Sequence, residues 1–311
     1  MMNTPSALDP QGAARFIAEL WWLLLGLGTI VFLVVMVYLI KALWRRQQGS
    51  PLDVPAPVGK TRAIVLGGII LPVIVLTVVL FATVRTLWAL SSLTKADPLV
   101  IHVIGQQWWW EVQYPDHQFE TANEIHIPVG EPVQIQLSSD NVIHSFWVPE
   151  LHGKLDLIPG KPNTFWIQAD RPGEYRGLCA EYCGVQHANM MFLVIAEPPE
   201  QFAAWLEAQR QPAAAPTDDL ARQGQEIFMT STCINCHAIA GTDATGDLGP
   251  DLTHLASRRT LGSAMIVNNV GNLGGWIADP QHIKPGNLMP PTPDLSGEGL
   301  QALLAYLQTL R

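Results

Sequence analysis

Two long apolar runs open the chain, ahead of any pattern typical of a soluble domain. Residues 16–43 and 63–90 are almost free of charged side chains, and each exceeds the ~20 residues that a helix needs to cross a ~30 Å hydrocarbon core. A signal peptide is the alternative for the first run, but this run is too long and lacks an obvious small-residue cleavage site. The pattern therefore predicts a hairpin of two retained membrane-spanning helices within residues 1–95.

The charges around these runs predict the orientation of the hairpin. The loop between them carries five basic residues and one carboxylate, namely Lys41, Arg45, Arg46, Lys60, Arg62 and Asp53. Because Lys and Arg are enriched in cytoplasmic loops, we expect this loop in the cytoplasm and both termini outside it. The expected location is a bacterial-type inner membrane, with lipid around both helices and the rest of the chain on the periplasmic side.

Short alternating apolar and polar runs follow over residues 96–210. Turn signals separate the runs, for example at Pro115-Asp116 and at Arg171-Pro172-Gly173. Strand periodicity with turns of this kind predicts an antiparallel β-sandwich or barrel. Residues 200–210 have the pattern of a short helix that closes this domain.

A Pro/Ala-rich linker over residues 211–217 leads into a helical C-terminal domain, residues 218–311. The helical pattern covers residues 219–228, 260–269 and 296–310. Ser296 is placed to cap the last of these helices. The C-terminal domain is therefore expected to be all-α.

Both soluble regions are acidic. Residues 91–211 carry a net charge of −9 and residues 212–311 a net charge of −4. Domains of like charge do not attract each other over a long range, so we expect the covalent linker to keep them close. We expect no nucleic-acid partner.

Two thiols, an imidazole and a thioether lie within twelve residues, at Cys179, Cys183, His187 and Met190. This soft ligand set suits copper better than magnesium or calcium. Cysteines four residues apart either bind one metal or bridge two, and His144 is the best candidate for the further imidazole that a two-copper site needs. Zinc would not need the thioether, and a mononuclear blue copper site would use one cysteine.

A second cluster, Cys233-Ile-Asn-Cys236-His237, has the CxxCH pattern of covalent haem attachment. A lone zinc knuckle is the alternative, but it would not explain Gly249-Pro250 and the later Asn287-Leu-Met289-Pro-Pro. The two motifs use all four cysteines of the chain, which therefore look like ligands and attachment points instead of a disulfide framework. One polypeptide is thus predicted to carry two electron-transfer centres.

The copper loop resembles that of subunit II of haem–copper cytochrome c oxidases. Its pattern CxExCGxxHxxM follows an upstream His-Ser-Phe, the aromatic run GQQWWW and two membrane spans, and the likeness covers roughly residues 15–210. The resemblance implies a cupredoxin-like fold for the sandwich and a dinuclear CuA centre. The resemblance implies that Cys179 and Cys183 are thiolates that bridge the two coppers. The implied further ligands are His144 and Met190 on one copper, and His187 and the backbone carbonyl of Glu181 on the other.

Two further roles rest on the same resemblance. Trp108 matches a tryptophan at which electrons arrive above the copper, and the side chain of Glu181 matches a magnesium ligand at the interface with subunit I. Packing in the sandwich core is the alternative for Trp108, and a solvated surface carboxylate is the alternative for Glu181. The chain departs from the family at about Val65, where many members have a glutamate at a proton channel. No acidic residue lies between Asp53 and Asp97.

The C-terminal region resembles a class I cytochrome c domain. The resemblance implies two thioether links to haem, a proximal histidine and a methionine as the sixth ligand. These residues are Cys233, Cys236, His237 and Met289. The carbonyl of Pro250 is expected to hold the histidine, and Met/His ligation raises the reduction potential. Met229 and Met265 are poorer axial candidates, because one is too close to the attachment site and the other falls in a predicted apolar helix.

Together these interpretations predict an electron-transfer subunit of a terminal oxidase. Electrons from an external donor, cytochrome c or a quinol–cytochrome c reductase, would pass through haem c and copper to the haem of subunit I, which reduces oxygen and moves protons. Subunit III is a further expected partner. The copper subunit of a nitric oxide reductase and a copper chaperone are the alternatives, and the second of these would need no haem.

Overall fold

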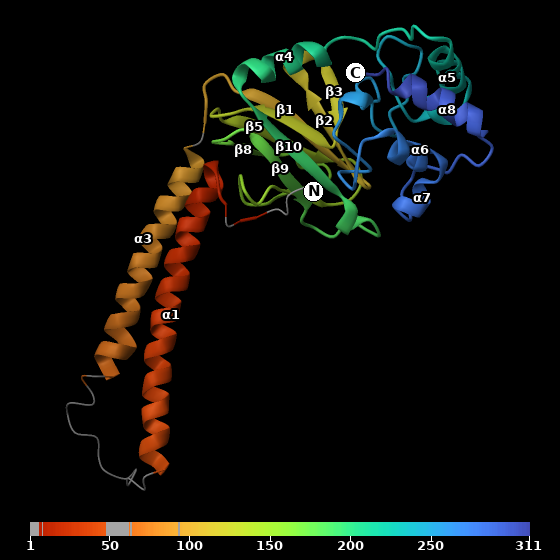
Figure 1. Cartoon of the computed structure of the whole chain (residues 1–311). Helices are drawn as coiled ribbons and strands as arrows, with labels where there is room; N and C mark the ends of the chain where they lie inside the picture. The colour runs from red at the N-terminus through yellow and green to blue at the C-terminus, as the bar shows by residue number, and fades with distance from the viewer. Residues whose placement is uncertain (1–5, 8, 48–61, 63, 93) are drawn as a thin grey trace. The chain divides into compact units, whose positions relative to one another are not determined.

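The computed structural model describes residues 6–7, 9–47, 62, 64–92 and 94–311. The chain divides into two compact units. One unit is Ala13–Leu93, and the other joins Met1–Gly12 to Thr94–Arg311. The first unit contains the long helices and the second contains the sheets and the short helices (Figure 1).

Two long helices make up the first unit. Helix α1 (Gly12–Gln47) contains the whole first apolar run, and α3 (Leu71–Ser91) follows a π-helical turn, η1 (Leu66–Ile70). Pro72 lies at the start of α3 directly after this turn, because a proline cannot donate the bond that would continue the preceding helix. Segments of 34 and 26 residues are apolar and long enough to cross a membrane. The two predicted spans are present as helices, whereas residues 48–61, which carry part of the charge that predicts the orientation, lie outside the described residues.

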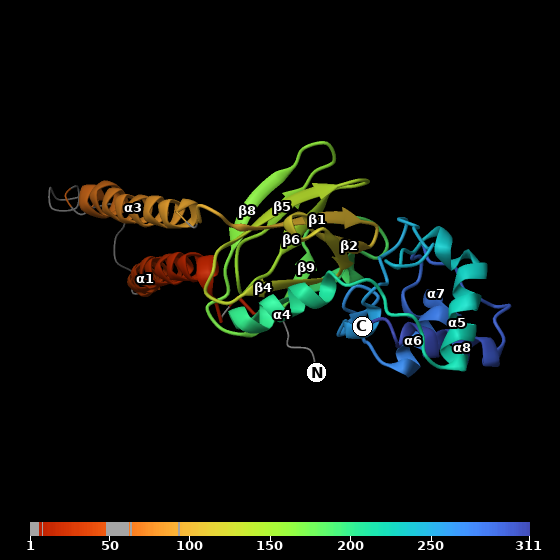
Figure 2. The ribbon, with the colours of Figure 1, turned by 90° about the horizontal axis from the view of Figure 1, so that it is seen from above.

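In the described part of the second unit, ten strands form two five-stranded sheets (Figure 2). Their order is β3-β2-β1-β5-β8 in one sheet and β4-β10-β9-β6-β7 in the other. The elements are β1 (Leu99–Gln106), β2 (Trp109–Tyr114), η2 (Pro115–His117), β3 (Phe119–Ala122), β4 (Glu124–Pro128), β5 (Val133–Ser139), β6 (His144–Trp147), β7 (Leu155–Leu157), β8 (Asn163–Ile167), β9 (Gly173–Cys179), η3 (His187–Asn189) and β10 (Met191–Glu197).

Two strand pairs differ from the predicted antiparallel arrangement. Strand β1 pairs with β5, and β10 pairs with β4, in parallel, whereas the other pairs of these sheets are antiparallel. Parallel neighbours need a crossover connection, which here runs through other strands of the domain. Alternation along a strand reports which face is buried and not the direction of the neighbouring strand. The predicted sandwich is therefore confirmed, and its antiparallel pattern holds for every pair of these sheets except these two.

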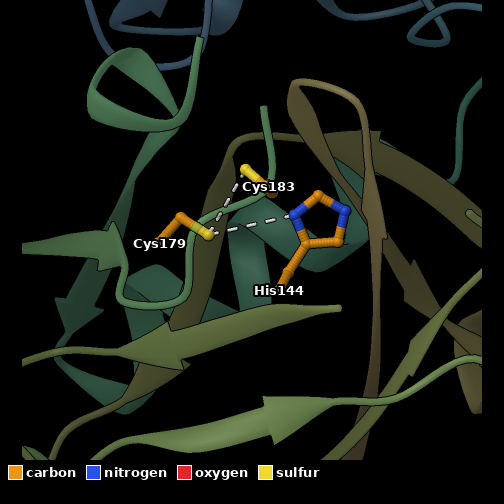
Figure 3. Close-up of side chains that lie close together, drawn as sticks. All are labelled: His144, Cys179 and Cys183. Carbon is orange, nitrogen blue, oxygen red and sulfur yellow. Dashed lines mark hydrogen bonds between the residues drawn. The ribbon is translucent and has the colours of Figure 1, made fainter. Parts of the chain in front are cut away.

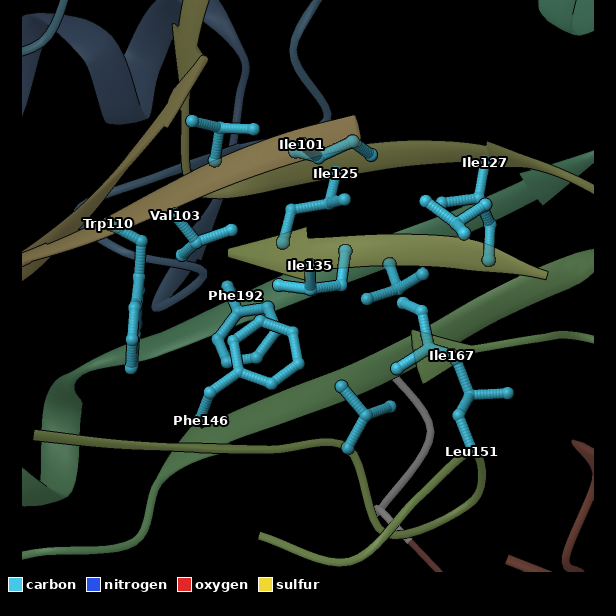
Figure 4. Close-up of a cluster of buried hydrophobic side chains, with 14 of the residues drawn as sticks. Ile101, Val103, Trp110, Ile125, Ile127, Ile135, Phe146, Leu151, Ile167 and Phe192 are labelled. Carbon is cyan, nitrogen blue, oxygen red and sulfur yellow. The ribbon is translucent and has the colours of Figure 1, made fainter. Parts of the chain in front are cut away.

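The core of this domain lies between the two sheets (Figure 4). Alternate residues of each strand point inward, as Ile101 and Val103 do in β1, where both are fully buried. Trp110, Phe146 and Phe192 pack with ring centroids 4.5 to 6.0 Å apart. Close packing of this kind holds the strand ends, and the loops that leave them, in fixed positions.

The segment before α1 packs against the sandwich. The side-chain oxygen of Gln11 accepts hydrogen bonds from Asp170 N at 3.1 Å, Arg171 N at 3.0 Å and the Tyr175 hydroxyl at 3.0 Å. Gln11 is buried, so these bonds satisfy a carbonyl group that has left water. The described residues before Gly12 thus belong with the second unit, whereas the hydrophobic pattern predicts them within the hairpin domain, residues 1–95.

Helix α4 (Pro199–Gln209) follows β10 at the predicted place. The C-terminal region then contains α5 (Asp219–Thr230), η4 (Thr232–Asn235), η5 (Leu255–Ser257), β11 (Thr260–Leu261), β12 (Ile266–Val267), α6 (Val270–Ala278), α7 (Pro280–Ile283) and α8 (Gly297–Leu307). The helices predicted at 219–228 and 296–310 are α5 and α8, and Ser296 accepts a bond from Gly299 N at 3.0 Å. The two helices approach closely at Gly224, where a Cβ would lie 1.9 Å from Ala302 O.

The predicted helix at 260–269 is wrong. A hairpin of β11 and β12 occupies this segment, and its turn contains Gly262, Ser263 and Ala264 with φ of 63°, 69° and 58°. Two of these three residues are not glycine, so local sequence gives little sign of the left-handed turn. The C-terminal region is therefore helical with one short hairpin, and Met265 lies in that hairpin turn and not in a helix.

Candidate copper and haem sites

Strand pairing brings His144 beside Cys179, and the loop after β9 returns Cys183 to the same place (Figure 3). Strands β6 and β9 are antiparallel neighbours with Phe146 opposite Cys179, so His144 at the start of β6 lies beside the end of β9. The sulfur of Cys179 is 3.8 Å from His144 Nδ1 and 3.8 Å from Cys183 Sγ. All three side chains are buried, and their ligand atoms lie within 4.8 Å of one another. This is a spacing that metal coordination can bridge.

The loop after β9 adds the other three predicted ligands. Cys183 Sγ lies 3.7 Å from His187 Nδ1 and 3.8 Å from Met190 Sδ. The backbone oxygen of Glu181 lies 3.3 Å from Cys179 Sγ. Turn η3 and a hydrogen bond of 3.0 Å from Cys179 N to Met190 O close the loop. The other four predicted ligands thus lie around the two cysteine sulfurs.

A hydrogen bond joins the sulfurs of Cys179 and Cys183. The hydrogen bond between the two sulfurs lowers the pKa of Cys179 to about 3, although burial acts in the opposite direction. The same hydrogen bond, together with burial, raises the pKa of Cys183. The two sulfurs therefore differ in how tightly they hold a proton. A cation between the sulfurs would replace the proton that they share.

The imidazole of His144 is oriented for metal binding. Asn141 Oδ1 lies 3.1 Å from His144 Nε2, and because the Asn141 oxygen accepts, the ring carries its proton on Nε2 and leaves Nδ1 free to face Cys179. Gly105 leaves room for the ring, since a Cβ there would lie 2.6 Å from His144 Cδ2. Sequence reasoning missed Asn141 and Gly105. The one available signal was a polar residue three positions before the histidine.

The aromatic run borders the copper loop. The indole N–H of Trp108 donates to Cys183 O at 3.0 Å, and Gln107 Nε2 donates to the same oxygen at 2.7 Å. Trp108 is half-buried, whereas Trp110 is fully buried in the sandwich core. The run therefore combines one core residue with two side chains that hold the backbone of the ligand loop.

The CxxCH motif forms a compact turn after α5. Cys233 and Cys236 are half-buried on and beside η4, and His237 N donates to Cys233 O at 3.0 Å. His237 Nδ1 lies 2.7 Å from Pro250 O, so Nδ1 carries the proton and Nε2 is left as the free ligand atom. Burial lowers the pKa of His237 and so favours the neutral form of the ring. The sequence therefore folds into a turn that fits a covalently attached haem.

Met289 lies on a separate loop after α7, and it is half-buried. Gln281 Nε2 donates to Met289 O and to Asn287 O, each at 2.9 Å, and Met289 N donates to Asn287 Oδ1 at 2.8 Å. These bonds fix the backbone around Met289. The other two methionines considered lie elsewhere, with Met229 against the core of the C-terminal domain.

Comparisons with known proteins match the two soluble regions of the chain to two families. Residues 117–197 match the family model of the periplasmic domain of cytochrome c oxidase subunit II, and residues 221–311 match that of cytochrome c. Cytochrome c oxidase subunit 2 of Alkalihalophilus pseudofirmus is 37% identical over 98% of this chain and 91% of its own length. The chain belongs to the cytochrome c oxidase subunit II family.

Other relatives carry the same name. Cytochrome c oxidase subunit 2 of Bacillus sp. strain PS3 is 34% identical over 86% of this chain and 80% of its own length. The solved periplasmic domain of subunit II of cytochrome oxidase (CoxB) of Bradyrhizobium japonicum is 34% identical, with 38% of this chain and 96% of that chain covered and a TM-score of 0.37.

Membership of the cytochrome c oxidase subunit II family establishes the general role of the chain. It is an electron-transfer subunit of a haem–copper oxidase complex, with a cupredoxin-like β-sandwich and a C-terminal cytochrome c domain. The cytochrome c domain implies haem c, and the subunit II family implies copper. Two apolar helices and a periplasmic domain make it a membrane protein.

Proposed function

We propose that this subunit receives electrons from an external donor, holds the haem c and the dinuclear copper through which they pass, and delivers them to subunit I for reduction of oxygen coupled to proton translocation. The observation that carries the proposal is the arrangement of the predicted copper ligands around the sulfurs of Cys179 and Cys183. Subunit III and membrane lipid are the further partners. The loop between α1 and α3 is cytoplasmic in this proposal, and both termini and the soluble domains are periplasmic.

The chain would bind copper with soft ligand atoms, most of them buried, on a backbone held by hydrogen bonds. His144 and Met190 would bind one copper, and His187 and the backbone oxygen of Glu181 would bind the other. The thiolates of Cys179 and Cys183 would be shared by both coppers. Hydrogen bonds to His144 Nε2 and to the Cys183 carbonyl hold the site from outside, so its geometry can stay nearly constant when its charge changes.

The C-terminal domain supplies the haem site. Cys233 and Cys236 would form the thioether links, His237 Nε2 would bind the iron on one side and Met289 Sδ on the other. Met/His ligation raises the reduction potential, as an electron carrier that feeds an oxidase requires. The hydrogen bond from His237 to Pro250 O fixes the orientation of the ring.

Two further roles belong to the proposal. Trp108 is the residue at which electrons reach the copper domain, supported by its hydrogen bond to Cys183 O in the ligand loop. The side chain of Glu181 is exposed and so is free to bind magnesium at an interface with subunit I, while its carbonyl oxygen faces Cys179.

An optical spectrum of the purified oxidase tests the proposal. We expect a c-type haem band together with near-infrared absorption from mixed-valence copper. Cys183→Ser should abolish the near-infrared absorption and leave the haem band, and replacement of the exposed His282 by alanine should leave both. A haem band without near-infrared absorption in the parent protein would overturn the copper assignment. A co-purified large subunit that reduces nitric oxide and not oxygen would overturn the oxidase assignment.

A further inference from the structure

A buried carboxylate joins the C-terminal domain to the sandwich. Glu124, at the start of the edge strand β4, is 3% exposed. Its Oε1 accepts hydrogen bonds from Arg259 N at 2.8 Å, Thr260 N at 2.9 Å and the Thr260 hydroxyl at 3.0 Å. The side chain of Arg259 also pairs with Glu174 on β9. Three donors on one oxygen hold the start of β11 against the sandwich.

A buried lysine makes a second contact between the domains. Lys284, which follows α7, is 3% exposed, and its Nζ donates to Trp108 O at 2.8 Å and to Gly262 O at 3.1 Å. The neighbouring carbonyl of Pro285 accepts a hydrogen bond from Gln186 Nε2, a side chain of the copper loop. The loop after α7 therefore contacts both the copper loop and the turn between β1 and β2 that contains Trp108.

The two acceptors of Lys284 come from different domains. Trp108 belongs to the sandwich, and Gly262 belongs to the turn between β11 and β12. An ammonium group removed from water is costly unless it is hydrogen-bonded. Lys284 Nζ therefore keeps both of these hydrogen bonds only while the two domains are in contact.

Lys284 is also connected to Met289 within its own loop. Asn287 Nδ2 donates to Lys284 O at 2.7 Å, and Asn287 Oδ1 accepts from Met289 N at 2.8 Å. Gln281 Nε2 donates to the carbonyl oxygens of Asn287 and Met289. On the other side, Trp108 donates through its indole to Cys183 O. A continuous set of hydrogen bonds thus joins the Met289 loop, through Lys284, to the copper loop.

We propose that Lys284 is a positioning residue for electron transfer between the haem and copper sites, because it couples docking of the two domains to the placement of the loop that carries Met289. The inference rests on the proposed function of the two sites. Glu124 contributes to the same docking contact, but its partners are Arg259 and Thr260 at the start of β11 and not residues of the Met289 loop. A substitution at Glu124 should therefore affect docking alone, whereas one at Lys284 should affect both docking and the position of Met289.

The test compares Lys284→Met, which keeps the length of the side chain but loses the ammonium group, with Glu124→Ala. Both variants should speed hydrogen exchange of the amides around 260–264 and slow haem-to-copper electron transfer. We expect the ratio of docked to undocked molecules to fall roughly 10- to 100-fold, which is the usual effect of losing a hydrogen bond to a charged group. Only Lys284→Met should also weaken the sulfur-to-iron charge-transfer band and shift the haem reduction potential.

Two further variants guard against misfolding and nonspecific effects. Lys284→Arg keeps a cation and should restore most of the transfer rate, and Lys161→Met removes an exposed lysine of the sandwich and should change nothing. Unchanged exchange and transfer in Lys284→Met would overturn the proposal. An unchanged sulfur-to-iron band in that variant would overturn the positioning role. Absence of the haem or copper spectrum in the parent protein would instead be a failure of the proposed function.

Discussion

Replacement of Asn141 by alanine should weaken copper binding about 10- to 100-fold, the usual effect of removing the hydrogen-bond partner of a metal-binding histidine. His144 is fully buried, and its Nε2 lies 3.1 Å from Asn141 Oδ1. The alanine variant would leave this buried N–H unpaired, at a cost of about 1–3 kcal/mol. It would also release the ring from the tautomer that directs Nδ1 toward Cys179.

An anaerobic competition titration of copper(I) against a chromophoric chelator measures this effect directly. Asn141→Asp keeps an oxygen acceptor, so its affinity should stay near that of the parent protein. Asn272→Ala, in the C-terminal domain, is the matched control and should bind copper normally. Parent-like affinity in Asn141→Ala would refute the argument that the Asn141 side chain orients His144.

Two more substitutions probe an ion pair of the sandwich and the packing beside His237. The hydrogen bond from His126, 3.0 Å away, lowers the pKa of Glu197, so the pair stabilises the fold above the ordinary glutamate pKa of 4.5 and loses that effect as the pH falls through the lowered value. Glu197→Gln should therefore reduce the free energy of unfolding in urea by about 1 kcal/mol at neutral pH and by little in strong acid, and an equal loss at both would contradict the assignment. Gly249→Ala would place a Cβ 2.7 Å from His237 Cε1, and its unfolding free energy should fall by about 1–3 kcal/mol. The haem spectrum should change with it, and a parent-like spectrum and melting temperature would show that the backbone can move aside.

The parts of the fold that were predictable have strong local patterns. The apolar runs are found in α1 and α3, and the cap at Ser296 lies at the start of α8. The β11–β12 hairpin could not be predicted because its left-handed turn contains Ser263 and Ala264, which rarely adopt a positive φ, whereas glycine does so readily. The parallel pairing of β1 with β5 was missed because alternation describes one strand and not its neighbour.

The candidate sites divide in the same way. Chemically distinctive residues such as Cys179 and His237 could be named from their spacing, because few other side chains form such motifs. Asn141, Gly105 and Lys284 could not, because their roles arise only from contacts that the tertiary structure creates. A lysine with no motif around it gives no sequence signal that it will be buried between two domains.

The contact between the two acidic domains should respond to salt in a distinctive direction. Their net charges of −9 and −4 oppose approach, whereas the contacts of Glu124 and Lys284 are buried and so are screened less than exposed charges. At 0.1 M salt the screening length is about 10 Å, which weakens the repulsion between whole domains more than the buried hydrogen bonds.

Cleavage of the linker at an inserted protease site near residues 214–216 makes this balance measurable. The cleaved protein loses the roughly millimolar effective concentration that a short tether provides, so haem-to-copper transfer should slow on dilution while the intact chain is unaffected. Between low and moderate salt, the dissociation constant of the cleaved domains should stay flat or decrease, because screening removes repulsion faster than attraction. A dissociation constant that rises steadily with salt would mean that exposed ion pairs such as Arg259 with Glu174 dominate the contact. Dilution-independent transfer after complete cleavage would mean that the buried contacts hold the domains together without the linker.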